Sequence, residues 1–368
     1  MRGGRTSHDR RALSRRRDGA SGTSPAVYQQ WDWRTKDGLL TRYATRGLMF
    51  PAAALRGRFP RDAGRFLWYI HLVTRRGLLL FAAMCVIWGI PYLLIRVAVG
   101  GIAPAVLVLG RTTIGALILM PFVLARGGLR GLGRKWIPLL AYAVCEVGVP
   151  WFFLSSAEQQ ISSSLAALLI SCVPLLGTLV APLFGRKSGL GTVGILGLVV
   201  GLGGVAAIVG IDFQASNTTA LLEMALVTVG YALGPAIVNR YLDGVPSMTV
   251  NGVSLAACAV VYVPIAATQW PRVLPGADVL VSVAVLGVVC TALAFLLFFA
   301  LIREVGPIRA TVITYINPAV AAIAGVLVLK ESFTVGMAIG FVLVLTGSFL
   351  ATRGRRAPPD RKKTEASA

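Results

Sequence analysis

Long apolar runs dominate the chain from Gly77 onward, and short breaks separate them. Each run holds about 20 residues, and a helix rising about 1.5 Å per residue crosses the roughly 30 Å hydrocarbon core of a bilayer at that length. Apolar and polar positions do not alternate within the runs, which argues against a transmembrane barrel. The pattern predicts ten spanning helices at about 77–98, 105–125, 136–156, 163–183, 192–211, 219–240, 247–268, 278–302, 308–329 and 333–352.

The composition agrees with an all-α integral membrane fold. Hydrophobic residues make up 56% of the 368 residues and charged residues only 14%, whereas a soluble domain carries about 25% charged residues. Helices are expected because backbone polar groups in lipid must be satisfied internally.

Both ends of the chain are strongly basic. Residues 1–76 hold 17 of the 36 Lys and Arg against five acidic residues, and residues 353–368 add six more basic residues. Such ends could bind nucleic acid, but basic residues that flank hydrophobic spans fit contact with anionic lipid better. We expect no nucleic-acid partner, a basic tail, and a disordered leader that is either regulatory or the product of a start codon placed too early.

The distribution of Lys and Arg among the loops predicts the topology. If the N-terminus is cytoplasmic, the outer loops carry only Arg272 and Lys330. The inner loops then carry Arg126, Arg130, Arg134, Lys135, Arg186, Lys187, Arg240, Arg303 and Arg309. Because positive charge marks cytoplasmic loops, both termini should lie on the cytoplasmic side of the cell membrane.

The chain repeats itself at an offset of 144 residues. This shift places Pro91 on Pro235, Arg96 on Arg240, Ala166 on Ala310, Pro174 on Pro318 and Gly203 on Gly347. The halves, 77–211 and 219–352, each hold five predicted helices, so the second half is inverted in the bilayer. Inverted repeats are typical of secondary transporters, whose substrate site lies near the midplane between the halves.

Residue types needed for metal binding or covalent catalysis are scarce in the spans. The five cysteines form no C-x-x-C pair, and the two histidines, His8 and His71, precede the first span. The sequence has no G-x-x-x-x-G-K-[ST] loop for ATP phosphates. We therefore expect no metal, no cofactor and no enzyme activity.

Two charges are predicted deep within the spans. Arg111 lies about a third of the way down the second helix, and Glu146 lies near the middle of the third. A charge at the bilayer centre costs about 2.5–3.5 kcal/mol even on lenient scales, so such residues normally find a partner. The two lie within about 7 Å in depth by helix rise, and they form either a substrate or proton site or a buried ion pair. Glu158 and Glu223 are expected at the solvated outer surface.

Aromatic residues within the spans are candidates for lining a cavity. Trp88, Tyr231 and Tyr315 lie deepest and either stack on a substrate or pack between helices. Glycines of the fifth helix, Gly194, Gly197, Gly201 and Gly204, predict close helix contacts. These contacts lie either within the fold or in a homodimer.

Prolines at matching places in the fourth and ninth helices predict kinks. A proline removes a backbone donor and frees a carbonyl, and interrupted helices at corresponding positions point to a transport site. Pro174 and Pro318 are therefore predicted helix kinks. Ser171 and Asn317, beside them, either bind a polar solute or satisfy the freed backbone groups.

Several segments together carry a family resemblance. They are Trp88-Gly89, Arg111, the stretch SSLAALLISCVP at Ser163–Pro174, the stretch IRATVITYINP at Ile308–Pro318, Lys330-Glu331 and the Gly340…Gly347 spacing. In order and spacing they resemble the EamA family of the drug/metabolite transporter superfamily over about residues 77–352. The resemblance implies ten helices, two repeats and transport of small metabolites, often as export, without specifying the substrate.

The sequence departs from this family in two places. Family repeats often place a Glu after the fourth helix, but the chain has Lys187 there and keeps the acid only as Glu331 in the second half. The first helix also lacks the membrane-embedded acid of small multidrug-resistance relatives. Proton-for-cation exchange by their mechanism is therefore disfavoured.

The sequence thus favours a secondary transporter that moves a small organic solute by alternating access. The candidate substrate-binding residues are Trp88, Arg111, Glu146, Tyr231, Tyr315 and Asn317. A membrane receptor or scaffold and an intramembrane lipid-modifying enzyme are the alternatives. Membrane lipid is an expected partner, and a coupling proton and a homodimer are left open.

Overall fold

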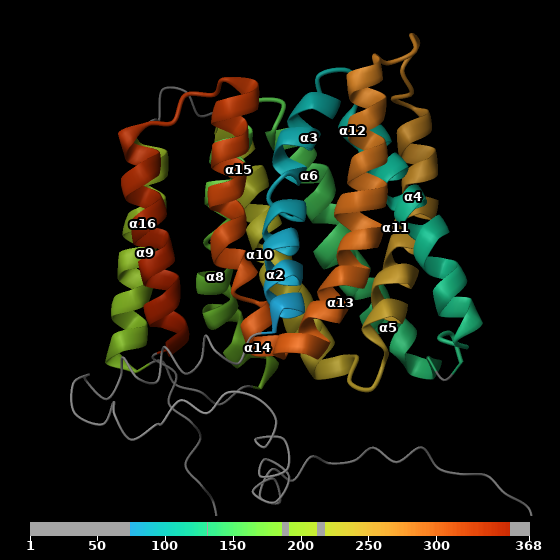
Figure 1. Cartoon of the computed structure of the whole chain (residues 1–368), viewed down its shortest axis with the longest axis horizontal. Helices are drawn as coiled ribbons and strands as arrows, with labels where there is room; N and C mark the ends of the chain where they lie inside the picture. Colours follow the sequence, from blue (N-terminus) through green and yellow to red (C-terminus); the bar gives the residue numbers. More distant parts are fainter. Residues whose placement is uncertain (1–73, 131, 186–190, 212–217, 354–368) are drawn as a thin grey trace, which may run out of the picture. The chain divides into compact units, whose positions relative to one another are not determined.

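The computed structural model describes residues 74–130, 132–185, 191–211 and 218–353, and these residues form a helical bundle without strands (Figure 1). The predicted leader and nearly all of the basic tail lie outside the described residues. In chain order the elements are α2 (Arg75–Ile87), α3 (Pro91–Ala98), α4 (Pro104–Ala125), η2 (Gly133–Lys135), α5 (Trp136–Tyr142), η3 (Ala143–Gly148), α6 (Val149–Ala157), α7 (Ser163–Ile170), α8 (Val173–Val180), η4 (Ala181–Phe184), α9 (Thr192–Ile211), α10 (Thr218–Tyr241), α11 (Ser247–Ala267), α12 (Ala277–Gly287), η6 (Val288–Leu293), α13 (Ala294–Val305), α14 (Pro307–Ala310), α15 (Ile313–Leu329) and α16 (Val335–Arg353).

Ten apolar helical segments confirm the predicted membrane fold. Among the described residues, nine are long and apolar enough to cross a membrane, and Ile313–Leu329 is apolar but shorter. The predicted ninth span, 308–329, is shortened because a turn at Thr311 and Val312 separates α14 from α15. Many side chains that point away from the bundle are large and apolar, as lipid contact requires.

Short interruptions divide several spans. A turn at Trp88–Ile90 separates α2 from α3, and Pro91 begins the second segment (Figure 1). Another turn at Ser171 and Cys172 separates α7 from α8. Backbone groups freed at such breaks are tolerated in a membrane where protein surrounds them.

Two π-helical turns occupy corresponding positions in the two halves. η3 lies between α5 and α6, and η6 lies between α12 and α13. The 144-residue offset takes η3 onto residues 287–292, one residue away from the observed bounds of η6, which is within the usual disagreement over helix boundaries. The π-helical backbone conformation is therefore repeated at positions where the side chains differ.

The glycines of α9 pack inside the chain. A Cβ placed on Gly204 would lie 2.7 Å from the backbone N of Val344 in α16, and one placed on Gly197 would overlap the backbone at Ala351. Figure 1 shows α9 and α16 side by side along one edge of the bundle. These glycines are explained by contact between the last helices of the two halves, so they carry no argument for a homodimer.

We call the end of the bundle that holds Ala98, Ser163 and Lys330 the outer end, following the predicted topology, and the opposite end the inner end. Helix α7 begins at the outer end, where the Ser162 hydroxyl accepts a bond from the backbone N–H of Leu165 at 3.2 Å. Such a cap satisfies one of the free N–H groups at a helix start.

Candidate functional site

A central cavity of about 330 Å³ lies between the two repeats. Its walls come from both halves, as a midplane transport site between inverted repeats requires. The lining residues are Trp88, Pro91, Tyr92, Ile95, Arg111, Glu146, Val147, Trp151, Leu154, Ile170, Ser171, Val173, Pro174, Tyr231, Pro235, Cys290, Phe295, Thr314, Asn317 and Pro318.

Many lining positions are related by the sequence repeat. The offset of 144 residues pairs Pro91 with Pro235, Glu146 with Cys290, Trp151 with Phe295, Ile170 with Thr314, Val173 with Asn317 and Pro174 with Pro318, all of which line the cavity. The same parts of the two repeats therefore face each other across the space. Their chemistry differs, because most charged and aromatic groups come from the first repeat.

Arg111 of α4 is fixed in the cavity wall by two neighbours. Its guanidinium lies 3.6 Å from the ring centroid of Trp151, and its Nε donates to Oγ1 of Thr291 at 2.9 Å. Thr291 in turn donates to the carbonyl of Leu286 at 2.8 Å, which satisfies a group within the η6 region. The side chain is only 8% exposed, so its position is held before any solute arrives.

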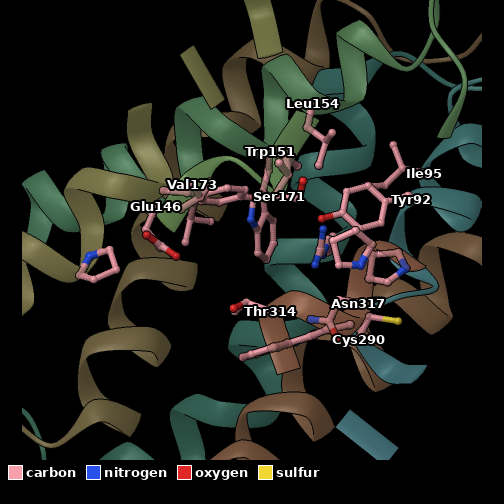
Figure 2. A pocket seen from close by; sticks show the side chains of 18 of the residues that line it. Tyr92, Ile95, Glu146, Trp151, Leu154, Ser171, Val173, Cys290, Thr314 and Asn317 are labelled. Atoms are coloured by element: carbon pink, nitrogen blue, oxygen red, sulfur yellow. The ribbon is translucent and has the colours of Figure 1, made fainter. Parts of the chain in front are cut away.

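Of the two alternatives for Arg111 and Glu146, the structure does not support a buried ion pair between them. Oε2 of Glu146 has no hydrogen-bond partner among the described residues, and Arg111 is instead engaged by Trp151 and Thr291. In Figure 2, Glu146 lies at one side of the cavity, apart from Tyr92 and Cys290. Similar depth in the bilayer was therefore not sufficient to predict the neighbours of Arg111, which are Thr291 and Trp151.

Glu146 lies within the π-helical turn η3. The turn is supported from α11, where Cys258 Sγ donates to the carbonyl of Ala143 at 3.5 Å and Tyr262 Oη donates to that of Gly148 at 3.0 Å. The carboxylate lies directly against Gly234 of α10, where any Cβ would overlap it. A π turn is frequent at functional sites, and here it directs an unpaired acid toward the cavity.

The other predicted aromatic residues separate into two groups. Trp88 and Tyr231 line the cavity, and Trp88 packs edge-on against Phe295 with centroids 6.2 Å apart. Tyr315 is half-buried and does not line the cavity. Its neighbour Thr314 lines the cavity instead.

Asn317 lines the cavity and is almost fully buried. With its amide nitrogen oriented toward acceptors, it donates to the carbonyls of Ile313 at 3.0 Å and Cys85 at 3.2 Å. These bonds satisfy backbone carbonyls at the start of α15 and near the end of α2. The amide oxygen is the remaining atom with which Asn317 can contact a solute.

The two prolines lie in different local structures. Pro174 stands in the first turn of α8, just after the interruption at Ser171 and Cys172. Pro318 lies inside α15, and the interruption in that span comes earlier, at Thr311 and Val312. Both prolines line the cavity.

A second cavity of about 420 Å³ adjoins the first on its inner side. The two share four lining residues, Val173, Pro174, Tyr231 and Pro235. From there the second cavity extends to Asn239, Arg240, Phe184 and Thr352 at the inner ends of their helices. The central cavity therefore continues toward the inner end.

The outer end is occupied by acidic side chains that the sequence misplaced. Glu158 is 0% exposed, so its predicted solvation is wrong. Glu223 is half-buried and accepts a bond from Ser156 Oγ at 2.7 Å, so it is not a free surface residue either. Across the parts of the chain with described structure, no cluster of His, Cys, Asp and Glu could hold a metal ion.

Comparisons with known proteins agree with this architecture. The family model described as the EamA-like transporter family matches the chain twice, at residues 75–210 and 218–353. The uncharacterized inner membrane transporter YedA of Escherichia coli K12 is 25% identical over 246 residues, covering 66% of this chain and 79% of that protein. The uncharacterized transporter YvbV of Bacillus subtilis 168 is 23% identical over 295 residues, covering 78% and 95%.

A solved crystal structure of a protein shares the fold, with a TM-score of 0.55 and 22% sequence identity over 75% of this chain and 96% of the other. The two family matches together cover both halves of the helical bundle. With ten apolar helical segments around a cavity shared by two repeats, the chain belongs to the EamA-like transporter family and is a multi-pass membrane transporter.

Proposed function

We propose that the protein is a secondary transporter that carries a small organic solute through the central cavity by alternating access. The observation that carries this proposal is the cavity itself, whose walls use corresponding positions of both repeats. Its volume of about 330 Å³ is at the lower end of the range of about 300–1,000 Å³ that is usual for ligand pockets. A metabolite-sized solute fits such a space.

Arg111 supplies the recognition of an anionic group in this proposal. Its Nε and one face of its guanidinium are engaged by Thr291 and Trp151, which leaves the terminal nitrogens to bind a carboxylate or phosphate in a forked geometry. Tyr92 and Tyr231 add hydroxyl groups to the wall. Apolar side chains make up most of the remaining surface and suit an organic body.

The second cavity supplies the inner half of the route. It adjoins the central cavity at Tyr231 and Pro235 and reaches Arg240 at the inner end. With both termini cytoplasmic, as the loop charges predict, this arrangement corresponds to an inward-facing state. Export then begins with solute entry past Arg240.

A flux assay tests this function. The purified full chain is reconstituted in vesicles and presented with a panel of carboxylate, phosphate and neutral metabolites. We expect uptake or counterflow of at least one anionic solute, and weaker flux in Arg111→Lys, which keeps the charge but loses the planar fork. Arg272→Lys in the exposed outer loop is the matched control. Absence of flux for the whole panel, with the protein correctly folded, would favour a receptor or scaffold.

A further inference from the structure

A second group of charged residues lies at the outer end, beyond the central cavity. It consists of Glu331 in the loop before α16, Glu158 at the end of α6 and Arg96 of α3. The transport proposal above uses none of them. The two carboxyl groups have opposite surroundings, and such pairs of acids commonly take different protonation states.

Glu331 joins the end of α15 to the start of α7. Its carboxylate accepts bonds from the backbone N–H groups of Ser163 (2.8 Å) and Ser164 (3.0 Å) and from their hydroxyls (3.0 and 2.6 Å). The left-handed conformation of Lys330, with φ of 57°, turns the chain back toward α7, and Gly325 leaves room for the carboxylate. This contact closes the outer end between the two repeats.

These bonds decide the charge of Glu331. Partial burial raises the pKa of its carboxyl group, but the bonds from Ser164 and Ser163 outweigh that effect, and the net pKa is lowered. A carboxylate at the start of a helix is also favoured by the helix dipole. Glu331 is therefore ionised in the closed outer end.

The residues that make this contact have no equivalents at the corresponding positions of the opposite repeats. The offset of 144 residues takes Glu331 onto Lys187, and Ser163 and Ser164 onto Pro307 and Ile308. Proline has no backbone N–H to donate, and neither counterpart has a hydroxyl. The inner end therefore lacks the residues that would build the same closure.

Glu158 lies within range of the charge of Glu331 but in the opposite environment. Its side chain is 0% exposed, and neither carboxyl oxygen has a hydrogen-bond partner among the described residues. Nη1 of Arg96 donates to the backbone carbonyl of Glu158, not to its carboxyl group. An ionised carboxylate without partners in such a place is costly, and neutralisation by a proton is the usual outcome.

The groups that act on Glu158 come from three helices and one loop. They are Tyr92 and Arg96 of α3, Arg111 of α4, Tyr231 of α10 and Glu331. Burial raises the pKa of Glu158 well above its ordinary value and Glu331 raises it further, while Arg96 and Arg111 oppose the shift without reversing it.

We propose that Glu158 is the proton-binding group of the outer closure, neutral while Glu331 holds the closure shut and deprotonated when the closure opens to water. The inference deepens the proposed transport function, because it assigns the outer gate a proton. The protonation of Glu158 in the closed state does not depend on which solute is transported. A group whose pKa is raised in one state favours that state at low pH and ceases to do so as the pH passes the raised pKa. Acid outside therefore keeps the gate shut, and rising external pH releases it.

Infrared difference spectroscopy of the full chain in lipid tests the protonation directly, with the proton itself as the probe. A protonated carboxylic acid has a C=O stretch separate from the bands of a carboxylate. At pH 7 we expect this band to be weaker in Glu158→Gln than in the wild type and to be unchanged in Glu223→Gln. Equal acid bands in the wild type and Glu158→Gln would overturn the proposal. If Glu158→Gln does not fold, Glu158→Leu provides a second neutral replacement for the same comparison, and the pH dependence of thiol labelling in the parent variant tests the proposal without any replacement of Glu158.

Thiol labelling tests the gate without any solute. Ile161 is buried at the outer end and its neighbour Gln160 is exposed, so Ile161→Cys reports opening and Gln160→Cys corrects for the pH dependence of the reagent. An impermeant thiol reagent should label Ile161→Cys faster, relative to Gln160→Cys, as external pH rises. With Glu158→Gln added, this relative rate should stay low at every pH. A relative rate that does not depend on pH in the parent variant would contradict the gating role, even where vesicle flux is normal.

Discussion

The π-helical turns η3 and η6 have the same position in the two repeats but carry different chemistry. Glu146 in η3 corresponds to Cys290 in η6, and both line the central cavity. The same contrast holds elsewhere, because Arg111 corresponds to Leu255 and Glu158 to Ile302. The first repeat contributes the charges of the cavity, Arg111 and Glu146, whereas the second contributes neutral groups such as Thr291 there and places its acid, Glu331, at the outer end. The backbone is thus duplicated, but the recognition chemistry is not.

The largest expected effect comes from giving the first repeat the residue of the second at Arg111. Arg111→Leu removes the proposed anion-binding group and leaves Thr291 and Trp151 without their partner. Loss of a buried, hydrogen-bonded charge costs about 2–5 kcal/mol, so we expect flux of an anionic solute to fall at least about 30-fold. Vesicle flux and thermal unfolding should be measured together. Unchanged flux would show that the cation serves only helix packing.

Glu146→Gln tests the second position at which the chemistry of the repeats differs, Glu146 in η3 against Cys290 in η6. We expect the variant to fold and to lose the part of the pH dependence of transport that arises in the cavity, since it removes the Glu146 carboxyl group while keeping its size. A single-proton group changes occupancy by at most about tenfold per pH unit, so with Glu158→Gln as the common background, Glu146→Gln should flatten the profile to within about twofold. Cys290→Ser, at the corresponding position, is the control. An unchanged profile in Glu146→Gln would make Glu146 a packing residue and direct attention to Asn317.

Gly234→Ala tests whether the close packing of the Glu146 carboxylate against α10 contributes to stability. The new methyl group would overlap the carboxylate, and overpacking of this kind costs about 1–3 kcal/mol. Gly203→Ala is the matched control, because a Cβ there meets nothing within 4 Å. Thermal unfolding should show a loss in the first variant and none in the second. If the loss persists when Glu146→Ala is added to Gly234→Ala, the clash with the carboxylate is not its cause.

The smallest effect concerns Glu331. Its pKa is lowered on folding, so its contribution to stability is present above the ordinary carboxyl pKa and is lost as the pH falls through the lowered value. Because the group is half-exposed, we expect about 1 kcal/mol or less. Unfolding of the wild type should therefore become easier below about pH 4.3, with a weaker dependence in Glu331→Gln. Asp278→Asn, at the same end, controls for general acid sensitivity, and an equal dependence in all three proteins would refute this role.

Hydropathy was sufficient to predict the helices and the repeat, because span length and periodicity are properties of the sequence alone. It also singled out Arg111 and Glu146, both of which line the cavity. Hydropathy did not predict which way individual side chains point around each helix. Thr291, the partner of Arg111, is 180 residues away, and nothing local signals that contact.

Glu158 and Tyr315 show two further limits. Polarity at a helix end suggests water, but Glu158 is 0% exposed, because tertiary packing at the outer end covers it. Tyr315 was a candidate for the cavity because of its depth in the ninth span. Depth does not determine which face of a helix points inward, and Thr314 lines the cavity instead.

The glycine contact between α9 and α16 has a mechanical consequence. Side chains at an interface can exchange rotamers and let two helices slide, but Gly204 and Gly340 bring main chain against main chain, with a Cβ on Gly340 only 2.6 Å from the carbonyl oxygen of Gly204. Backbones in direct contact leave the two helices almost no room to shift against each other. We therefore expect the last helices of the two repeats to move as one rigid unit in the proposed transport cycle, while the remaining helices move relative to them.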